Sequence, residues 1–309
     1  MKRNTSIIRS YKNKSAVESA AQIIFICCAF VAVLAVASIT AYMIVSGTPA
    51  LAKIGITEIL FGTVWKPAAA EPSFGVLYVI LTSIVGTFAA IFIGVPIGVC
   101  TAVFLAETAP KKIAAIVKPA VELLAGIPSV IYGLLGILIL NPLMYRLERH
   151  IFEDSETHQF TGGANLISAV IVLAVMILPT VINVSESAIK AVPEHLKSAS
   201  LAVGASKMQT IFKVILPAAK SGIVTAIVLG VGRAIGEAMA ISLVSGSSVN
   251  LPLPFNSVRF LTTAIVSEMG YATDTHREVL FTIGLVLFVF IMLINITLTK
   301  ILKHSNVEE

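Results

Sequence analysis

Charged residues are scarce in this sequence: Asp, Glu, Lys and Arg together make up 13% of its 309 residues, about half the share found in soluble globular domains. Apolar residues make up 57%, against roughly 45 to 50% in such domains. A water-soluble fold of this size needs more polar residues to cover its surface. We therefore expect a lipid bilayer to be the solvent for much of the chain, which forms one membrane domain.

Cysteine and histidine are also few, with three and five residues respectively. Cys27, Cys28 and Cys100 lie inside apolar runs and match no disulfide or zinc spacing, so we interpret them as small buried hydrophobes. The histidines never pair at a metal-ligand interval, and the basic residues form no stripe of the kind that binds nucleic acid. We expect no metal site, no cofactor and no nucleic-acid partner.

Several catalytic motifs are missing. The sequence has no G-x-x-x-x-G-K-[ST] loop, so the chain is not expected to bind and split ATP by itself. It also lacks H-E-x-x-H, G-x-S-x-G and paired intramembrane aspartates, which leaves a membrane-embedded hydrolase without a candidate active site. These absences favour a non-catalytic membrane protein.

Six apolar stretches approach the length of about 20 residues that a bilayer-spanning helix needs. They predict an all-α, polytopic membrane protein of about six transmembrane helices. Pro96, Pro128 and Pro179 fall inside the second, third and fourth stretches and predict kinks or breaks there. The stretches are Ala20–Ser46, Gly75–Leu105, Val117–Leu143, Leu166–Ile189, Gly222–Val244 and Val279–Leu302.

The distribution of Lys and Arg predicts the orientation. Fifteen of them lie in the segments on one side of the membrane and six on the other, with Arg233 left inside. Because cytoplasmic segments carry the excess of basic residues, both termini are expected in the cytoplasm. The predicted units are a cytoplasmic leader 1–19, a first transmembrane anchor 20–46, an outer segment 47–74, a core 75–302 with a cytoplasmic loop 190–221 and an outer segment 245–278, and a cytoplasmic tail 303–309.

Two outer segments are more than plain polar loops. In the first, Trp65 is expected to hold the chain at headgroup depth. In the second, Asn256–Tyr271 is amphipathic and too short to span, so we expect a short helix on the outer face or a shallow re-entry.

Arg233 and Glu237 are charged residues within the fifth apolar stretch. Each costs roughly 2.5 to 3.5 kcal/mol near the bilayer centre, so both need a compensating environment. A spacing of four places them on one face of a helix. They form either a structural ion pair that fixes helix packing or part of a transport path, since intramembrane charges usually face a cavity or pathway.

Small residues recur on the same stretch. Gly222, Ala226, Gly230 and Ala234 follow one another at steps of four, and Gly232 precedes Gly236 by four. Small residues at this spacing let another helix approach closely. We expect this stretch to pack against a neighbouring helix.

A polar stripe is predicted near the start of the third stretch. Glu122, Ser129 and Tyr132 share one helical face if Pro128 does not rotate it. The stripe either lines a pore or satisfies backbone groups that the proline frees, and the sequence favours neither interpretation.

The loop 190–221 reads as two short helical runs separated by Gly204, followed by Leu216-Pro217 where the chain returns to the membrane. Two amphipathic helices on the basic side of a membrane protein indicate a docking surface. The loop resembles the coupling motif of ABC importer permeases, E-A-A, three residues, G, nine residues, I-x-L-P. Here the corresponding residues are Ser198-Ala199-Ser200, Gly204, Val214, Leu216 and Pro217.

Four further segments resemble the C-type permease subunit of phosphate-specific ABC transporters, from about Gly62 to the end. They are ELLAGIPSVIYG (122–133), GRAIGEAMA (232–240), RFLTTAIVSEMG (259–270) and LFTIGLVLFVFIMLIN (280–295). The resemblance implies a type I ABC importer permease fold in a prokaryotic plasma (inner) membrane, with the outer segments periplasmic. It also implies three partners: a second, A-type permease, a cytoplasmic ATPase dimer and a periplasmic phosphate-binding protein.

The resemblance also implies residue roles. Arg233 and Glu237 match the family's intramembrane pair in the translocation pathway, and the loop residues Ser198, Ala199, Gly204, Leu216 and Pro217 would couple to the ATPase. Ser198 departs from the usual Glu of the motif and Ser200 from an Ala, and Glu194, one turn earlier, is a candidate for the missing acid.

Two alternatives remain beside phosphate import. One is a permease for another oxyanion, such as phosphonate, sulfate or molybdate, although RFLTTAIVSEMG and the charged pair argue against it. The other is a membrane sensor that reports phosphate status to a cytoplasmic partner.

Overall fold

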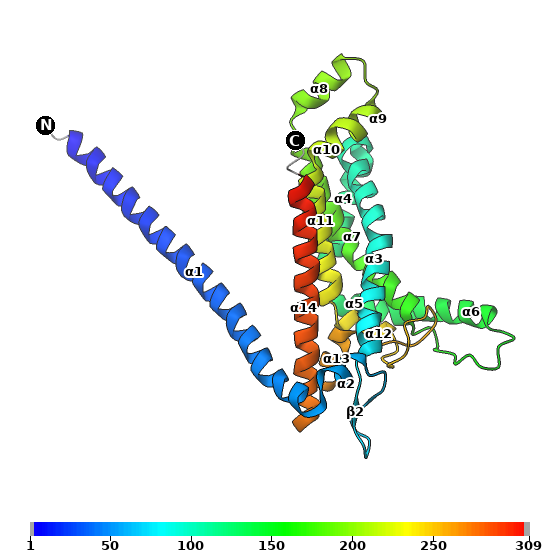
Figure 1. The fold of residues 1–309 in the computed structure, drawn as a ribbon. Coiled ribbons are helices and arrows are strands. Elements are labelled where there is room, and N and C mark those ends of the chain that lie inside the picture. Colours follow the sequence, from blue (N-terminus) through cyan, green and yellow to red (C-terminus); the bar gives the residue numbers. More distant parts are fainter. Residues whose placement is uncertain (1–2, 306–309) are drawn as a thin grey trace.

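The computed structural model describes the chain from Arg3 to Ser305, with side-chain surroundings for residues 18–297 and residue 300. The predicted leader 1–19 and tail 303–309 therefore lie partly outside the described residues. Long helices dominate, which confirms the all-α prediction. They are α1 Arg3–Ile54, α3 Leu77–Val103, α7 Leu166–Lys190, α11 Lys220–Gly236 and α14 Asp274–Ser305. In Figure 1, α3, α7, α11 and α14 run alongside one another as a bundle, and α1 leaves this bundle at an angle.

About six spans are present, as predicted. In the part of the chain that the structure describes, five helices are long and apolar enough to cross a membrane, or up to six if a bent pair, Lys207–Ala218 with Lys220–Gly236, is one span. α3, α7 and α14 cover the second, fourth and sixth predicted stretches, and α1 contains the first. Both α3 and α7 continue through their internal prolines, Pro96 and Pro179.

The third predicted stretch is broken at Pro128, as expected, but the span that crosses begins later than predicted. The chain forms α4 Lys111–Gly126, then an extended step at Ile127 and Pro128, then α5 Ser129–Leu135. Proline has no N–H to donate and disfavours helical geometry in the residue before it, so the helix ends here. The chain continues as η2 Gly136–Leu140 and α6 Asn141–Ile151, and the span long enough to cross begins at Ser129.

The fifth predicted stretch is also interrupted. α11 ends at Gly236, Glu237 is extended with φ −73° and ψ 132°, and α12 Met239–Val244 follows. Glycine is a poor helix former, and α11 ends on one. The Glu237 carboxylate Oε1 accepts a hydrogen bond from the Ala240 N–H at 2.9 Å, as capping side chains do at the start of a helix. The single helix expected over Gly222–Val244 was therefore wrong.

Small residues allow close packing around the central α7. A Cβ at Gly222 of α11 would lie 2.3 Å from the Ala188 Cβ, and one at Gly230 would lie 2.9 Å from Val181 Cγ2. Gly94 of α3 faces Ile177 in the same way. The predicted close packing of the fifth stretch is confirmed for Gly222 and Gly230. Gly232 and Gly236 instead have nothing within 4 Å of an added Cβ, so they do not belong to this interface.

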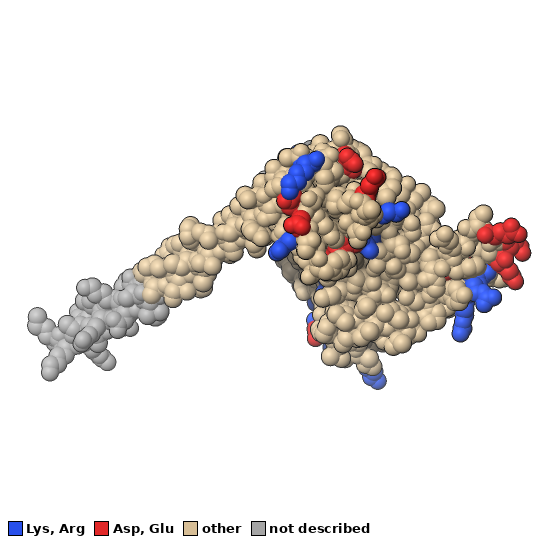
Figure 2. Space-filling model, turned by 90° about the horizontal axis from the view of Figure 1, so that it is seen from below, with Lys and Arg blue, Asp and Glu red and all other residues tan. Residues whose placement is uncertain are grey.

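The outside of the bundle is apolar. Phe92 on α3 is 82% exposed and Phe25 on α1 is 72% exposed, an arrangement that suits lipid or a protein partner but not water. Cys27, Cys28 and Cys100 are exposed on the same helices. Their interpretation as buried residues was wrong, because the outer face of a membrane helix is apolar too. Seen from below, charged side chains gather in a few groups and most of the visible surface is uncharged (Figure 2).

The outer segments pack together at the end of the bundle opposite the loop 190–221 (Figure 1). The first contains α2 Ile56–Phe61 and a two-stranded antiparallel hairpin, β1 Trp65–Lys66 with β2 Ser73–Phe74. The second contains the short helix α13 Leu261–Glu268, as expected for a segment too short to span. The indole of Trp65 donates from Nε1 to the Glu268 carboxylate at 3.2 Å. Trp65 therefore joins the two outer segments, instead of simply facing headgroups.

Candidate functional site

Arg233 lies in the last turn of α11, just before the helix break. Its guanidinium Nη1 donates to Thr180 Oγ1 of α7 at 3.4 Å, and both side chains are half-buried. Thr180 directly follows Pro179, in the middle of the helix against which α11 packs. The arginine is therefore positioned by two helices and keeps most of its donors available.

Glu237 lies in the break itself. Its carboxylate accepts from the Ala240 N–H, and its backbone carbonyl accepts from Thr262 Oγ1 of α13 at 2.7 Å. No ion pair joins Arg233 to Glu237 among the described contacts. The shared helical face inferred from their spacing was wrong, because α11 ends between them. The two residues instead mark the two sides of a discontinuous helix.

Tyr132 on α5 faces the same region. Its side chain is buried, its hydroxyl donates to the Leu124 carbonyl at 2.7 Å, and it lies within electrostatic reach of Arg233. The next residue, Gly133, abuts α12: an added Cβ would lie 3.0 Å from Ala240 Cα. α5 and α12 are therefore neighbours next to the break.

The proposed polar stripe is interrupted by the break at Pro128. Glu122 is exposed on α4, Ser129 is half-buried at the start of α5, and Tyr132 is buried one turn later. One common face required an unbroken helix, so the face is lost. The hydroxyl of Tyr132 spans the break through Leu124, which satisfies one backbone carbonyl there.

Thr180 and Thr262 were missed by sequence reasoning. Both hydroxyls act across helices, Thr180 on Arg233 and Thr262 on the Glu237 carbonyl. A threonine in an apolar helix is the only signal available, and it is ambiguous because many such hydroxyls bond within their own helix, as Thr101 does to the Ile97 carbonyl.

The loop 190–221 forms the two predicted helices. α8 spans Glu194–Ala202; Gly204 turns the chain with φ +89°; then α9 Lys207–Thr210, η3 Ile211–Ile215 and α10 Leu216–Ala218 lead into α11. Ser206 and Gln209 form a capping box at the start of α9. The loop lies at one end of the molecule (Figure 1) and exposes large apolar side chains, namely Leu201, Val203, Met208 and Phe212.

The motif residues of the loop have distinct surroundings. Ser198 is exposed and donates to the Glu194 carbonyl of its own helix at 3.1 Å, and Ala199 and Pro217 are exposed while Leu216 is half-buried. Ser200 Oγ lies 2.9 Å from Thr210 Oγ1, which links α8 to α9. The side chain of Glu194 is 84% exposed.

Glu268 forms a buried polar cluster at the outer end. Its carboxylate accepts from Trp65, from Arg259 and from His276 Nε2, the last at 2.7 Å. These residues come from the hairpin, the chain before α13 and the start of α14. The cluster fixes α13, whose Thr262 in turn contacts the helix break.

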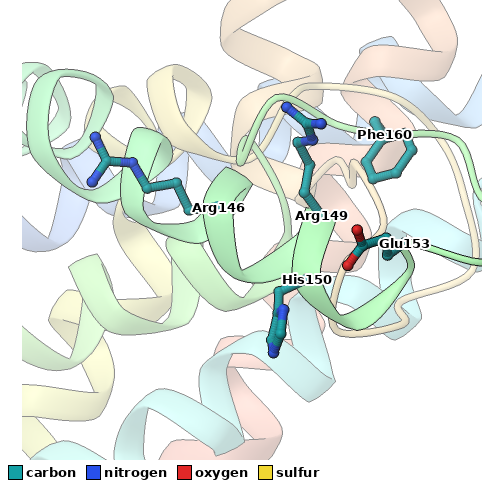
Figure 3. Close-up of a pocket in the computed structure, with 5 residues that line it drawn as sticks. All are labelled: Arg146, Arg149, His150, Glu153 and Phe160. Atoms are coloured by element: carbon teal, nitrogen blue, oxygen red, sulfur yellow. The ribbon is translucent and has the colours of Figure 1, made fainter.

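A cavity of about 470 Å³ lies beside α6, which leaves the bundle sideways (Figure 1), and shares no residue with the Arg233 site. Its lining residues are Arg146, Arg149, His150, Glu153 and Phe160. In Figure 3 the guanidinium groups of Arg146 and Arg149 and the imidazole of His150 point in three different directions. The side chains therefore do not converge on one point. Among the described residues, no group of three or more His, Cys, Asp or Glu is placed to hold a metal ion.

The chain is similar to known membrane transport proteins. Residues 94–305 match the family of binding-protein-dependent transport system inner membrane components. The chain is 37% identical to a probable ABC transporter permease, YqgH, of Bacillus subtilis, over 93% of each chain. It is 34% identical to the phosphate transport system permease protein PstC of Xylella fastidiosa, over 83% of this chain and 81% of that protein. It is 31% identical to PstC of Haemophilus influenzae, over 91% of each.

A solved structure supports the fold. The inward-facing MetNI methionine ABC transporter aligns with a TM-score of 0.53 and 24% identity, over 72% of this chain and 93% of that one. This similarity concerns the fold alone.

Proposed function

The chain belongs to the family of binding-protein-dependent transport system inner membrane components, and on that premise we propose that it is a permease subunit of an ATP-driven importer of inorganic phosphate. It forms half of the translocation pathway and hydrolyses no ATP itself. The relatives named as phosphate permeases support the substrate. The missing phosphate-binding loop supports a non-catalytic role.

The observation that carries the proposal is Arg233 at a helix break in the membrane. Broken helices are common at the substrate sites of transporters, where irregular backbone lines a cavity. A guanidinium presents planar pairs of donors that match phosphate oxygens, and Arg233 uses only one recorded hydrogen bond, a long one to Thr180. A long, replaceable bond suits a site that must release its cargo.

The residues around Arg233 take supporting roles. Glu237 holds the break through Ala240 and presents its remaining carboxylate surface near the pathway. Tyr132 on α5 lies within electrostatic reach of Arg233, and we assign Ser129 of α5 and Glu122 of α4 to the pathway beside it as part of the same proposal.

The partners follow from the same assignment. A second, A-type permease completes the pathway, a periplasmic phosphate-binding protein delivers phosphate, and a cytoplasmic ABC ATPase dimer supplies the energy. Ser198, Ala199, Gly204, Leu216 and Pro217 belong to the coupling surface, together with the exposed apolar residues of α8, α9 and η3. Both termini lie in the cytoplasm of a prokaryotic cell, in line with the excess of Lys and Arg on that side.

Uptake by cells that lack this chain tests the proposal. Restoring the chain should restore ATP-dependent uptake of labelled phosphate at micromolar concentration, with competition by unlabelled phosphate and none by sulfate or molybdate. Competition by another oxyanion alone would assign a different substrate. Unchanged uptake on deletion, with altered expression of phosphate-responsive genes, would instead assign the sensor role.

A further inference from the structure

The first coupling helix, α8, is held to the bundle by polar contacts. None of its nine residues is buried, so packing of an apolar face does not fix its position. Its Lys197 instead forms an ion pair with Glu107, whose side chain lies in η1 Phe104–Thr108 at the end of α3. The two side chains are 18% and 9% exposed, well shielded for charges on a loop.

The position of Glu107 links the ion pair to a helix of the bundle. η1 is a π-helical turn that continues directly from α3, and such turns often occur at functional positions. α3 packs tightly along α7: an added Cβ at Gly94 would lie 2.7 Å from Ile177, and one at Gly98 would lie 2.8 Å from Val181. Ile177 and Val181 flank Thr180 in sequence, and Thr180 contacts Arg233.

A continuous series of contacts thus runs from α8 to Arg233. It passes through Lys197, Glu107, the α3–α7 packing and Thr180. The α3–α7 links are close-packed, and packed interiors transmit displacement because they are nearly incompressible. The final link is the long hydrogen bond from Arg233 to Thr180. At the neighbouring motif position, the hydrogen bond described for Ser198 stays within α8. Glu194 lies 4.0 Å from Lys197, but its side chain is 84% exposed and belongs to α8 itself, so it does not brace the helix against the bundle.

We propose that the Lys197–Glu107 ion pair is the intramolecular link that transmits movement of α8, driven by the docked ATPase, to α3 and so to the Arg233 site. The two residues position the coupling helix and do not touch the transported anion. The proposal rests on the assignment of the chain as an importer permease and adds the residues that couple it.

The test uses the reconstituted complex with its binding protein and inorganic phosphate as substrate. Removing one partner alone leaves a shielded, unpaired charge and risks misfolding. The informative variant is therefore the neutral pair Glu107→Gln with Lys197→Met, compared with the exchanged pair Glu107→Lys with Lys197→Glu. The matched control is a second neutral pair, Lys53→Met with Glu278→Gln, which removes an ion pair between the end of α1 and the start of α14, away from the loop 190–221.

Two quantities are measured for each variant: co-purification of the ATPase, and phosphate imported per ATP hydrolysed. The neutral pair should retain the ATPase but import at least about fivefold less phosphate per ATP, the lower end of typical coupling between sites. The exchanged pair should recover most of that loss, and the control pair Lys53→Met with Glu278→Gln should match the wild type.

Normal import per ATP in the neutral pair would overturn the proposal. So would an exchanged pair as uncoupled as the neutral one, since a correct charge pair would then be insufficient. A loss of ATPase binding in the neutral pair would also overturn it, because the residues would then serve assembly. A wild-type complex that imports no phosphate would refute the proposed function itself, a result distinct from all of these.

Discussion

At the scale of single residues, the position of Arg233 depends on where α11 ends. The helix stops three residues after it, and the Thr180 hydroxyl of α7 accepts one of its hydrogen bonds. The charge is thereby held at a helix end next to a break, in contact with α7. This position avoids the high free energy of a guanidinium that faces lipid. Only the tertiary contact between α7 and α11 determines which hydroxyl meets the guanidinium, so the sequence alone does not predict Thr180.

Thr180→Val tests this contact. Valine has nearly the shape of threonine but offers no acceptor. The donor is charged, but the bond is long, 3.4 Å, so we expect it to contribute about 0.5 to 1.5 kcal/mol, below the usual range for hydrogen bonds to charged groups. We expect the phosphate concentration for half-maximal uptake to rise roughly two- to tenfold with assembly unchanged. Thr180→Ser, which keeps the hydroxyl, should stay close to the wild type. Equal affinity in the Val and Ser variants would show that Thr180 does not position Arg233.

At the scale of elements, the two coupling helices depend on a single turn. Gly204 has φ +89° and open space around its Cβ position, so its identity matters for backbone conformation and not for packing. A side chain with a Cβ costs roughly 1 kcal/mol or more at positive φ, whereas Asn tolerates such values better than most residues.

Gly204→Leu should therefore reorient α8 against α9. ATP hydrolysis by the complex is expected to continue while phosphate transported per ATP falls severalfold. Gly204→Asn should be affected less. If the Leu variant imported phosphate with wild-type stoichiometry, the turn would not set the geometry of the docking surface.

The small residues of α11 allow a second comparison between elements. Helix propensity alone predicts that Gly222→Ala and Gly232→Ala each stabilise α11 by about 1 kcal/mol. Gly222, however, lies against Ala188, whose Cβ cannot rotate away and would be 2.3 Å from the new methyl group. Overpacking of this kind costs about 1 to 3 kcal/mol.

Thermal unfolding of the purified chain in detergent should separate the two substitutions. The melting temperature is expected to fall for Gly222→Ala and to hold or rise for Gly232→Ala, whose methyl group enters open space. A fall of the same size in both would mean that packing against α7 is not what constrains Gly222.

The elements were predictable from the sequence only in part. Apolar length identified α3, α7 and α14, because burial in lipid is read directly from hydropathy. Hydropathy does not report helix continuity. Pro128 predicted the kink or break in the third stretch, whereas the break at Glu237 was missed. Pro96 and Pro179 do not end their helices while Pro128 does, and that difference depends on tertiary packing that local sequence does not encode. The loop helices were predicted correctly because Gly204 and the capping residues act locally.

At the scale of the whole molecule, the two ends have different constructions. One end carries α8 and α9 with exposed apolar side chains, and the other carries the hairpin, α13 and the buried Glu268 cluster (Figure 1). The end with the Glu268 cluster is braced by buried charge, and we propose that the end with α8 and α9 docks the ATPase. Between them, the Lys197–Glu107 ion pair and the packing of α3 and α11 against α7 connect α8 to Arg233. An ATP-driven importer needs such a connection if hydrolysis outside the membrane is to act within it.

The most direct test of this account is uptake of labelled phosphate into vesicles that contain the assembled complex, comparing the wild type with Arg233→Gln and Arg233→Lys. With ATP and the binding protein present, the wild type should accumulate phosphate. Arg233→Gln should assemble normally yet fall to background, and Arg233→Lys should retain part of the activity, because it keeps the charge but loses the planar pair of donors. Wild-type uptake by an assembled Arg233→Gln complex would contradict the claim that Arg233 lies in the phosphate pathway.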